Sequence, residues 1–288
     1  MKSMAALLYN VFKIRIGIAI MLSALAGLAV TPGAAPPAWQ IAILAIAVLA
    51  SSAAAGAFNH LVERDLDARM ARTRMRPFVT GRFHAGPAWY LGILGLLAAA
   101  VGGAAVVLNG WVALYVFLGA FVYGVVYTVW LKRRTAWNIV IGGLSGSFAV
   151  LAGAAAVDPA LSTPAMLLAV VLFLWTPPHF WSLAAALRDD YAQAGVPMLP
   201  VVVGQSTAAH VILLHTLLLV GVSLLPTLYG LGWAYWLGAA LGGTYFLVRS
   251  VQYALDPTPR KAMQNFFASL AQLTLLIVGA FADAAIGL

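Results

Sequence analysis

The sequence predicts an all-α, polytopic membrane protein, and three observations lead to this fold class. Of the 288 residues, 63% are hydrophobic and only 8% are charged, whereas soluble domains carry about 25% charged residues. Apolar stretches repeatedly reach the length of about 20 residues that a helix needs to cross a bilayer. These stretches are continuous, whereas a transmembrane β-barrel would show short segments of alternating polarity. The chain has no cysteine, which excludes disulfides and thiolate metal sites.

Nine apolar stretches are predicted to span the membrane as helices. In chain order they cover residues 14–30, 38–58, 88–107, 111–130, 136–157, 164–186, 208–227, 231–248 and 264–282. Turn-forming residues separate several of them: Pro32, Pro36 and Pro37, then Asn109-Gly110, Asp158-Pro159, Thr163-Pro164, and Gly230 with Gly232. No convincing cleavage site follows the first stretch, so we interpret it as a retained span. We expect residues 1–288 to form a single transmembrane domain.

The basic residues test this layout. All sixteen fall on one side of the membrane if there are nine spans: Lys2, Lys13, Arg15, Arg64, Arg69, Arg72, Arg74, Arg76, Arg82, Lys132, Arg133, Arg134, Arg188, Arg249, Arg260 and Lys261. The positive-inside rule assigns that side to the cytoplasm. The N-terminus is then cytoplasmic and the C-terminus lies on the opposite side. The two long cytoplasmic loops, about 59–87 and 187–207, are where a functional site is expected.

Topology does not explain the acidic residues in these loops. Asn59, Glu63 and Asp67 follow span two at intervals of four, which places them on one face if the helix continues. Such a stack is repulsive unless a cation bridges it, and oxygen ligands favour Mg²⁺, Mn²⁺ or Ca²⁺ over zinc. Asp65 would point elsewhere on a regular helix but joins the candidate ligands if the segment unwinds. The alternative is a solvated charged cap paired with neighbouring arginines.

A second acidic group strengthens the metal hypothesis. Asp189 and Asp190 follow span six and so emerge on the same side as the first group. Two carboxylate groups flanked by arginines suit a diphosphate ester, since Mg²⁺ binds a carboxylate or two together with phosphate oxygens. An apolar chain on that ester would extend into the bundle. We therefore expect Asn59, Glu63, Asp65, Asp67, Asp189 and Asp190 to hold the metal through the diphosphate.

Basic residues near these groups are candidates for phosphate contacts, because arginine binds phosphate through two parallel hydrogen bonds. The candidates are Lys13, Arg15, Arg72, Arg76, Lys132 and Arg188. Arg72 and Arg76 would share a face if their segment is helical. For each of these residues, the alternative is that its positive charge serves only to fix the topology. For Lys13 and Arg15, a second alternative is contact with the carboxylates of the acceptor substrate.

Three side chains inside the spans are also candidates. His179 follows Pro177-Pro178, and two prolines are expected to break span six. Irregular backbone at membrane depth is tolerated where it is buried or lines a cavity. Tyr123 and Tyr127 lie one turn apart in span four, where their rings would shield an allylic cation or mark the membrane interface.

Four stretches make the chain resemble the UbiA-type intramembrane prenyltransferases. They are Asn59 to Gly81 with its RTRMRP, WLKRRTAWNIVIGG from Trp130, PPHFWSLA from Pro177, and DDYAQAGVPMLPVVVG from Asp189. The first is similar to the family motif Asn-x3-Asp-x3-Asp, and the last two are similar to the branch that modifies haem. The sequence departs from the motif at Glu63, and Arg188-Asp189-Asp190-Tyr191 stands in place of a clean second motif. Which aspartate of the second group would ligate metal therefore stays open.

The resemblance implies a helical bundle around a central cavity and a Mg²⁺-dependent enzyme, with Mn²⁺ as the alternative metal. It implies transfer of farnesyl from farnesyl diphosphate to a vinyl group of haem B, a substrate rather than a prosthetic group, with addition of water. It makes His179 a candidate haem contact or acid–base group. We expect a bacterial inner-membrane protein that contacts the lipid bilayer, binds no nucleic acid and serves as a docking partner for a downstream haem-modifying enzyme.

Other functions remain as alternatives. The same fold would act on an aromatic acid, a quinone precursor or a chlorin. A transporter or haem carrier would show charged residues within the spans, whereas here charges gather at one water boundary. A CDP-alcohol phosphotransferase requires a glycine that DLDARMAR lacks, and a zinc membrane protease requires a HExxH pair.

Overall fold

The structure, a computed structural model, describes residues 3–287, so Lys2 lies outside the described residues. The helices are α1 (Met4–Val11), α2 (Ile14–Ala29), α3 (Ala38–Val62), α4 (Arg64–Arg69), α5 (Pro87–Val107), α6 (Gly110–Phe121), the π-helix η1 (Val122–Leu131), α7 (Asn138–Gly142), α8 (Leu144–Ala155), α9 (Thr163–Ala186), α10 (Arg188–Gln193), α11 (Leu199–Val203), α12 (Gln205–Leu224), the 3-10 helix η2 (Leu225–Tyr229), α13 (Trp233–Leu255) and α14 (Pro259–Ile286). The described residues contain no strand, so the predicted all-α class is confirmed.

Seven helices within the described residues are long and apolar enough to cross a membrane, and the bent pair α1–α2 would make eight. The eighth predicted span, residues 231–248, coincides with α13, which is 23 residues long but falls outside this group. Tryptophan, tyrosine, glycine and Arg249 in α13 lower its hydropathy. The predicted count of nine is therefore not confirmed, although each predicted stretch coincides with a helix or with two consecutive helices.

Local chemistry explains where many of these helices begin. Proline occupies the first turn of α5, α9 and α14, where its missing N–H costs no hydrogen bond. The side chain of Asn109 accepts a hydrogen bond from the backbone N–H of Val112 and caps α6. The side chain of Thr258 caps α14 in the same way. The Asn109 cap lies at a turn that the sequence predicted, whereas no turn was predicted at Thr258.

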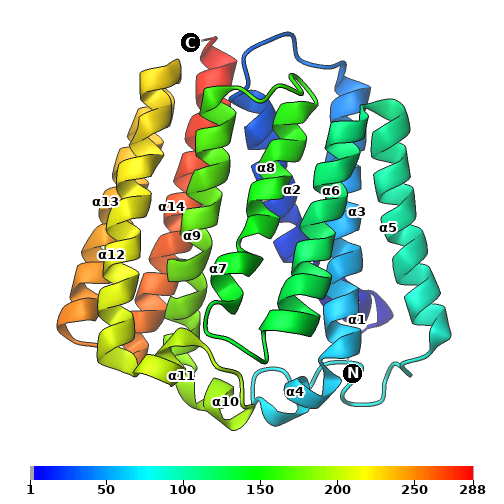
Figure 1. Cartoon of the computed structure of the whole chain (residues 1–288), viewed down its shortest axis with the longest axis vertical. Helices are drawn as coiled ribbons and strands as arrows, with labels where there is room; N and C mark the ends of the chain where they lie inside the picture. Colours follow the sequence, from blue (N-terminus) through cyan, green and yellow to red (C-terminus); the bar gives the residue numbers. More distant parts are fainter. Residues whose placement is uncertain (1–2, 288) are drawn as a thin grey trace.

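The long helices run alongside one another and form one bundle (Figure 1). α2, α3, α5, α6 and α8 pack together in the first half of the chain, and α9, α12, α13 and α14 in the second. Contacts of α8 with α9, and of α2 with α14, join the two halves. The short helices α4, α10 and α11 lie together at one end of the bundle (Figure 1). The loops that carry most of the basic residues are at that end.

Three local features differ from the sequence-based expectation. α9 is continuous through Pro177 and Pro178, so the predicted break in span six is wrong. Both prolines are buried between helices, and packing of this kind stabilises prolines within transmembrane helices. The first span is preceded by α1, and the two helices meet at an angle of 49°. Span four ends in a π-helix, a rare form that is frequently found at functional sites.

Candidate functional site

The two acidic segments lie at the same end of the bundle. α4 and α10 are neighbours in Figure 1, below the long helices. Leu66 of α4 and Tyr191 of α10 belong to one buried apolar cluster, together with Trp181 of α9. The two halves of the chain therefore meet beneath this part of the bundle, and each half contributes carboxylates there.

Asn59, Glu63 and Asp67 form a buried polar row at the end of α3. Glu63 separates α3 from α4, yet the backbone N–H of Glu63 donates to the Asn59 carbonyl, and that of Asp67 donates to the Glu63 carbonyl. The helical register therefore continues through the break. The three residues are 2%, 1% and 3% exposed, respectively. This row is not the solvated cap that was the alternative, because water hardly reaches it.

Each buried carboxylate has a basic partner. The Lys132 ammonium donates to Glu63 Oε2 at 2.5 Å, and Arg76 Nη1 donates to both carboxylate oxygens of Asp67 at 2.7 and 2.8 Å. Both partners are themselves largely buried. Buried charges are costly unless paired and hydrogen-bonded, so these contacts make the row compatible with the folded state. They also bring two predicted phosphate-binding residues to the predicted metal ligands.

Lys13 connects the first helix pair to this row. It lies between α1 and α2 with φ of +49°, a left-handed conformation that is uncommon for a lysine. Its ammonium donates to Asn59 Oδ1 at 2.6 Å and to the Tyr123 hydroxyl at 2.8 Å. Its side chain lies over Gly56, where the absence of a Cβ gives it room. The bend between α1 and α2 therefore directs Lys13 into the bundle instead of toward the interface.

The π-helix brings two tyrosines to the same place. The rings of Tyr123 and Tyr127 stack with centroids 5.7 Å apart. The Lys13 ammonium lies 5.4 Å from the Tyr123 ring, and the Lys132 ammonium lies 5.7 Å from the Tyr127 ring. Two cations already face the rings at the distance of a cation–π contact. This arrangement differs from that of tyrosines at a lipid interface.

The remaining charged candidates of the first acidic segment lie at the surface. Asp65 is half exposed and accepts two hydrogen bonds from the Arg133 guanidinium, at 2.6 and 2.7 Å. Arg133 lowers the pKa of the Asp65 carboxyl, whereas burial raises the pKa of Asp67 despite the opposing effect of Arg76. Arg72 is exposed in a non-helical turn, so the expected shared face with Arg76 does not form.

The second acidic segment is less buried. The Asp189 side chain is 89% exposed, and its nearest basic group is that of Arg188, 3.9 Å away. Arg188 also donates to the Pro200 carbonyl at 3.1 Å, which holds α10 against α11. Asp190 is partly buried, and Arg15 is exposed on α2. No hydrogen bond or ion pair of the described residues joins any of these four side chains to the buried row.

The buried row fits a divalent cation that is completed by its substrate. Glu63 Oε1 is buried and has no hydrogen-bond partner, so one carboxylate oxygen is left for another ligand. Among the described residues, no three histidine, aspartate or glutamate side chains gather closely enough to hold a metal alone. Mg²⁺ commonly uses one or two carboxylates together with substrate phosphates. Asn59, Glu63 and Asp67 supply oxygen donors of this type.

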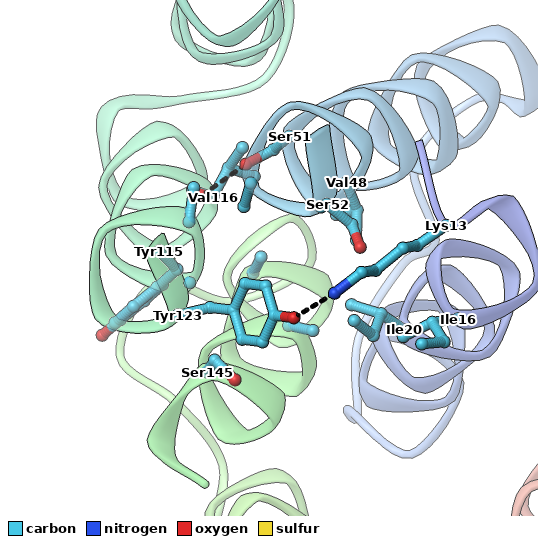
Figure 2. A pocket seen from close by; sticks show the side chains of 16 residues that line it. Lys13, Ile16, Ile20, Val48, Ser51, Ser52, Tyr115, Val116, Tyr123 and Ser145 are labelled. Carbon is cyan, nitrogen blue, oxygen red and sulfur yellow. Dashed lines mark hydrogen bonds between the residues drawn. The ribbon is translucent and has the colours of Figure 1, made fainter. Parts of the chain in front are cut away.

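An apolar cavity extends from Lys13 and Tyr123 into the bundle (Figure 2). It lies between α2, α3, α6 and α8, and most of its lining side chains are alanine, glycine or serine. In Figure 2 the Lys13 ammonium points toward the Tyr123 hydroxyl at one side of this space. A cationic group thus stands at the entrance of an apolar space, which suits a molecule with an anionic head and an apolar tail.

His179 is buried in the second half of the bundle. Its ring lies between those of Trp175 and Phe266, at centroid distances of 4.1 and 4.5 Å, and its Nδ1 lies 2.7 Å from Ser269 Oγ. It makes no hydrogen bond to the buried row. The predicted roles of His179 as a haem contact or acid–base group remain predictions.

Two residues of the site were missed by sequence reasoning. The Asn59 amide donates to Thr128 Oγ1 at 3.1 Å, which fixes its carbonyl oxygen toward Lys13. His60 is 4% exposed, and its Nδ1 has no hydrogen-bond partner. His60 directly follows Asn59, so its position in the motif was the available signal. Thr128 gave none, because its place depends on the π-helix.

Comparison with known proteins gives one family. The model of the UbiA prenyltransferase family matches residues 20–273. Protoheme IX farnesyltransferase 2 of Paramagnetospirillum magneticum is 60% identical over 276 residues, which cover 96% of each chain. Protoheme IX farnesyltransferase 1 of the same organism is 48% identical over 95% of this chain and 96% of its own.

Solved structures show the same fold at low sequence identity. A digeranylgeranylglyceryl phosphate synthase has a TM-score of 0.80 at 15% identity and covers 99% of each chain. A UbiA homologue from Archaeoglobus fulgidus, bound to DMAPP and Mg²⁺, has a TM-score of 0.72 at 15% identity over 97% of this chain and 99% of its own. At this identity the similarity establishes the arrangement of helices alone.

Proposed function

The chain belongs to the UbiA prenyltransferase family, and from this premise we propose that it transfers the farnesyl group of farnesyl diphosphate to a vinyl group of haem B. Water completes the addition, and the products are haem O and diphosphate. The observation that carries the proposal is the buried row of carboxylates and cations at the entrance of an apolar cavity. The relatives that share most of the sequence are named for this reaction.

Diphosphate would bind through the three cations that lie nearest the buried row. Lys13, Arg76 and Lys132 donate to protein oxygens in the structure, and each would redirect its N–H groups toward phosphate oxygens. Glu63 and Asp67, released from these pairs, would hold Mg²⁺ with Asn59. When bound, the metal supplies positive charge to the departing diphosphate, where negative charge grows.

The tyrosine pair would act on the other side of the breaking bond. Loss of diphosphate leaves an allylic cation, and the faces of Tyr123 and Tyr127 carry the negative charge that attracts one. Lys13 and Lys132 lie near those faces in the structure, so their movement toward phosphate would free the rings. The apolar cavity would keep water from the cation until the vinyl carbon of haem B has attacked it.

The surface candidates would have secondary roles. Asp189 and Asp190 would contribute to the metal from the second half of the bundle. Asp65, the remaining predicted ligand, would stay paired with Arg133 at the surface and would not contact the metal. Arg15, Arg72 and Arg188 would attract the anionic substrates, and electrostatic attraction of this kind acts mainly on association rates. His179 would contact the haem or move a proton during the addition of water.

The direct test uses the purified protein in liposomes with haem B and farnesyl diphosphate. Chromatography with mass detection should show farnesylated, hydrated haem, and inorganic diphosphate should appear in equal amount. EDTA should stop both, and added Mg²⁺ should restore them, with Mn²⁺ tested in parallel. Unchanged haem together with turnover of another aromatic or tetrapyrrole acceptor would favour the alternative enzyme. Absence of diphosphate release with every acceptor would favour a carrier.

The chain is an integral membrane protein, as its family and its apolar helices establish. We propose the bacterial inner membrane, with the polar site on the cytoplasmic side and the C-terminus opposite. A cysteine introduced near Arg74 should react with a membrane-impermeant thiol reagent only in inverted vesicles. We further propose that a haem-modifying enzyme docks to receive the product, which co-purification from native membranes would test.

A further inference from the structure

The apolar cavity has a wide middle made by small side chains. Ser52, Ala55 and Gly56 of α3 face Gly119 of α6 and Ser145 of α8 across it. Larger side chains stand at its two ends. Lys13 and Tyr123 stand at the polar entrance. Ile20, Val48 and Val116 lie seven or eight residues along their helices from Lys13, Gly56 and Tyr123, which is about 10–12 Å at a rise of 1.5 Å per residue. The cavity therefore has one polar end and one end bounded by branched apolar side chains.

Backbone contact between α2 and α8 closes the far end. A Cβ on Gly27 would overlap the Val150 carbonyl oxygen, and a Cβ on Gly153 would overlap the Ala24 carbonyl oxygen. The two helices thus touch through their backbones just beyond Ile20. The side chains there belong to a buried apolar cluster that includes Val48 and Ala152. Val48 therefore stands in front of this contact, and rotamer changes cannot open a path beyond it, because the helix backbones themselves form the barrier.

The depth of the cavity follows from the helix that lines its whole length. Gly56 and Val48 of α3 are eight residues apart, which corresponds to about 12 Å at a rise of 1.5 Å per residue. With C–C bonds of about 1.5 Å, an extended chain of three isoprene units measures roughly 13 Å, and each further unit adds about 5 Å. The depth suits three units and is too short for four.

We propose that this cavity selects the length of the isoprenoid tail and that Val48, supported by the crossing of α2 and α8, is the residue that stops it. The inference rests on the proposed function, since it assigns the tail of the prenyl diphosphate to this cavity. Val48 is 4% exposed and stands at the closed end. Lys13 holds the diphosphate end at the entrance, so the distance between these two residues sets the tail length that fits.

Two substitutions change the closed end in opposite directions. Val48→Ala enlarges it and should raise the ratio of kcat/KM for geranylgeranyl over farnesyl diphosphate by at least about tenfold, the range typical of small changes in an apolar pocket. Ala152→Leu fills it, because the new side chain points back along α8 toward Ser145. That variant should raise the ratio for geranyl over farnesyl diphosphate by about tenfold.

Val112→Ala is the matched control. Val112 is fully buried in the same apolar cluster as Val48 but does not line the cavity. Val112→Ala therefore makes the same valine-to-alanine change in the same cluster without altering the cavity wall. Its ratios should stay within about twofold of wild type. If Ala152→Leu does not fold because the new side chain overpacks the core, Val48→Ala and its control still decide the question.

A binding measurement separates this proposal from the proposed function. Geranyl, farnesyl and geranylgeranyl diphosphates are compared as competitors of radiolabelled farnesyl diphosphate on wild type and on each variant. If haem is not farnesylated but Val48→Ala shifts the binding preference toward the longer tail, the proposed reaction fails and the tail site stands. If wild type farnesylates haem and Val48→Ala changes neither turnover nor binding ratios beyond its control, the tail site is overturned.

Discussion

Replacement of Asp67 by asparagine tests the central feature of the site, the buried carboxylate row. The change keeps the shape of the side chain and removes its charge. Arg76 would lose an ionic partner that it binds through two hydrogen bonds of 2.7 and 2.8 Å. Removing one member of a fully buried ion pair costs about 3–5 kcal/mol. The Arg76 side chain is 19% exposed, and the asparagine oxygen still accepts a hydrogen bond, so we expect about 2 kcal/mol.

The loss of activity should exceed what this destabilisation explains. Without the Asp67 charge, the site would lose a proposed metal ligand that acts where charge develops, and removal of one group that stabilises developing charge lowers kcat by about 10²–10³-fold. Haem O formation and diphosphate release should both fall by this factor at a temperature well below the melting temperature of the variant. Size-exclusion chromatography and thermal unfolding in detergent would show that the variant is still folded.

Asp65→Asn is the control for Asp67→Asn, since it makes the same change two residues away. Asp65 is half exposed and paired with a partly exposed Arg133, and exposed pairs contribute about 1 kcal/mol or less. Turnover should stay within about twofold of wild type. Near-normal turnover in Asp67→Asn, or equal losses in both variants, would refute the assignment of the metal role to the buried row.

Three further measurements address other contacts. Arg133 lowers the pKa of Asp65 below its usual 3.8, so this pair stabilises the fold fully above that pH and loses its effect as the pH falls through the lowered pKa. Arg133→Ala should therefore reduce the melting temperature slightly at pH 7, and a difference that does not shrink as the pH is lowered stepwise from 3.8 would contradict this. Lys13→Met should raise the KM for farnesyl diphosphate about tenfold or more, as expected for a hydrogen bond to a charged group, and an unchanged KM would remove Lys13 from the phosphate site. Gly153→Val should prevent accumulation of folded protein, because a Cβ at position 153 would overlap the α2 backbone. Gly146→Val should accumulate normally, because a Cβ at position 146 has no neighbouring atom within 4 Å.

The sequence predicted the helices well because length and hydropathy determine them. Each predicted span agrees with a helix, or with two consecutive helices, to within a few residues at most ends, since about 20 apolar residues are needed to cross a bilayer whatever their neighbours are. The resemblance to the UbiA family is likewise confirmed. The bend before α2 was not predicted, because the polar contacts of Lys13 that accompany it join α2 to residues far along the chain.

The site was predicted only in part, for a related reason. The spacing of Asn59, Glu63 and Asp67 is local, and helical periodicity correctly placed them on one face. Their partners are not local, since Lys132 lies 69 residues beyond Glu63 in the chain. The predicted break at Pro177 failed because burial among neighbouring helices, and not the intrinsic preference of proline, determines the backbone there.

Lys13 contacts both the buried row and the apolar cavity. Its ammonium is fixed by Asn59 and Tyr123, and its side chain lines the entrance of the cavity. The far end is fixed by backbone contact between α2 and α8. α2 begins directly after Lys13 and contains Gly27, so Lys13 and the helix that follows it would provide both the proposed anchor for the diphosphate and the proposed barrier for the tail. The separation of these two points along the helix follows from the number of residues between them, so the fold would position the breaking bond and the end of the tail together if farnesyl diphosphate binds as proposed.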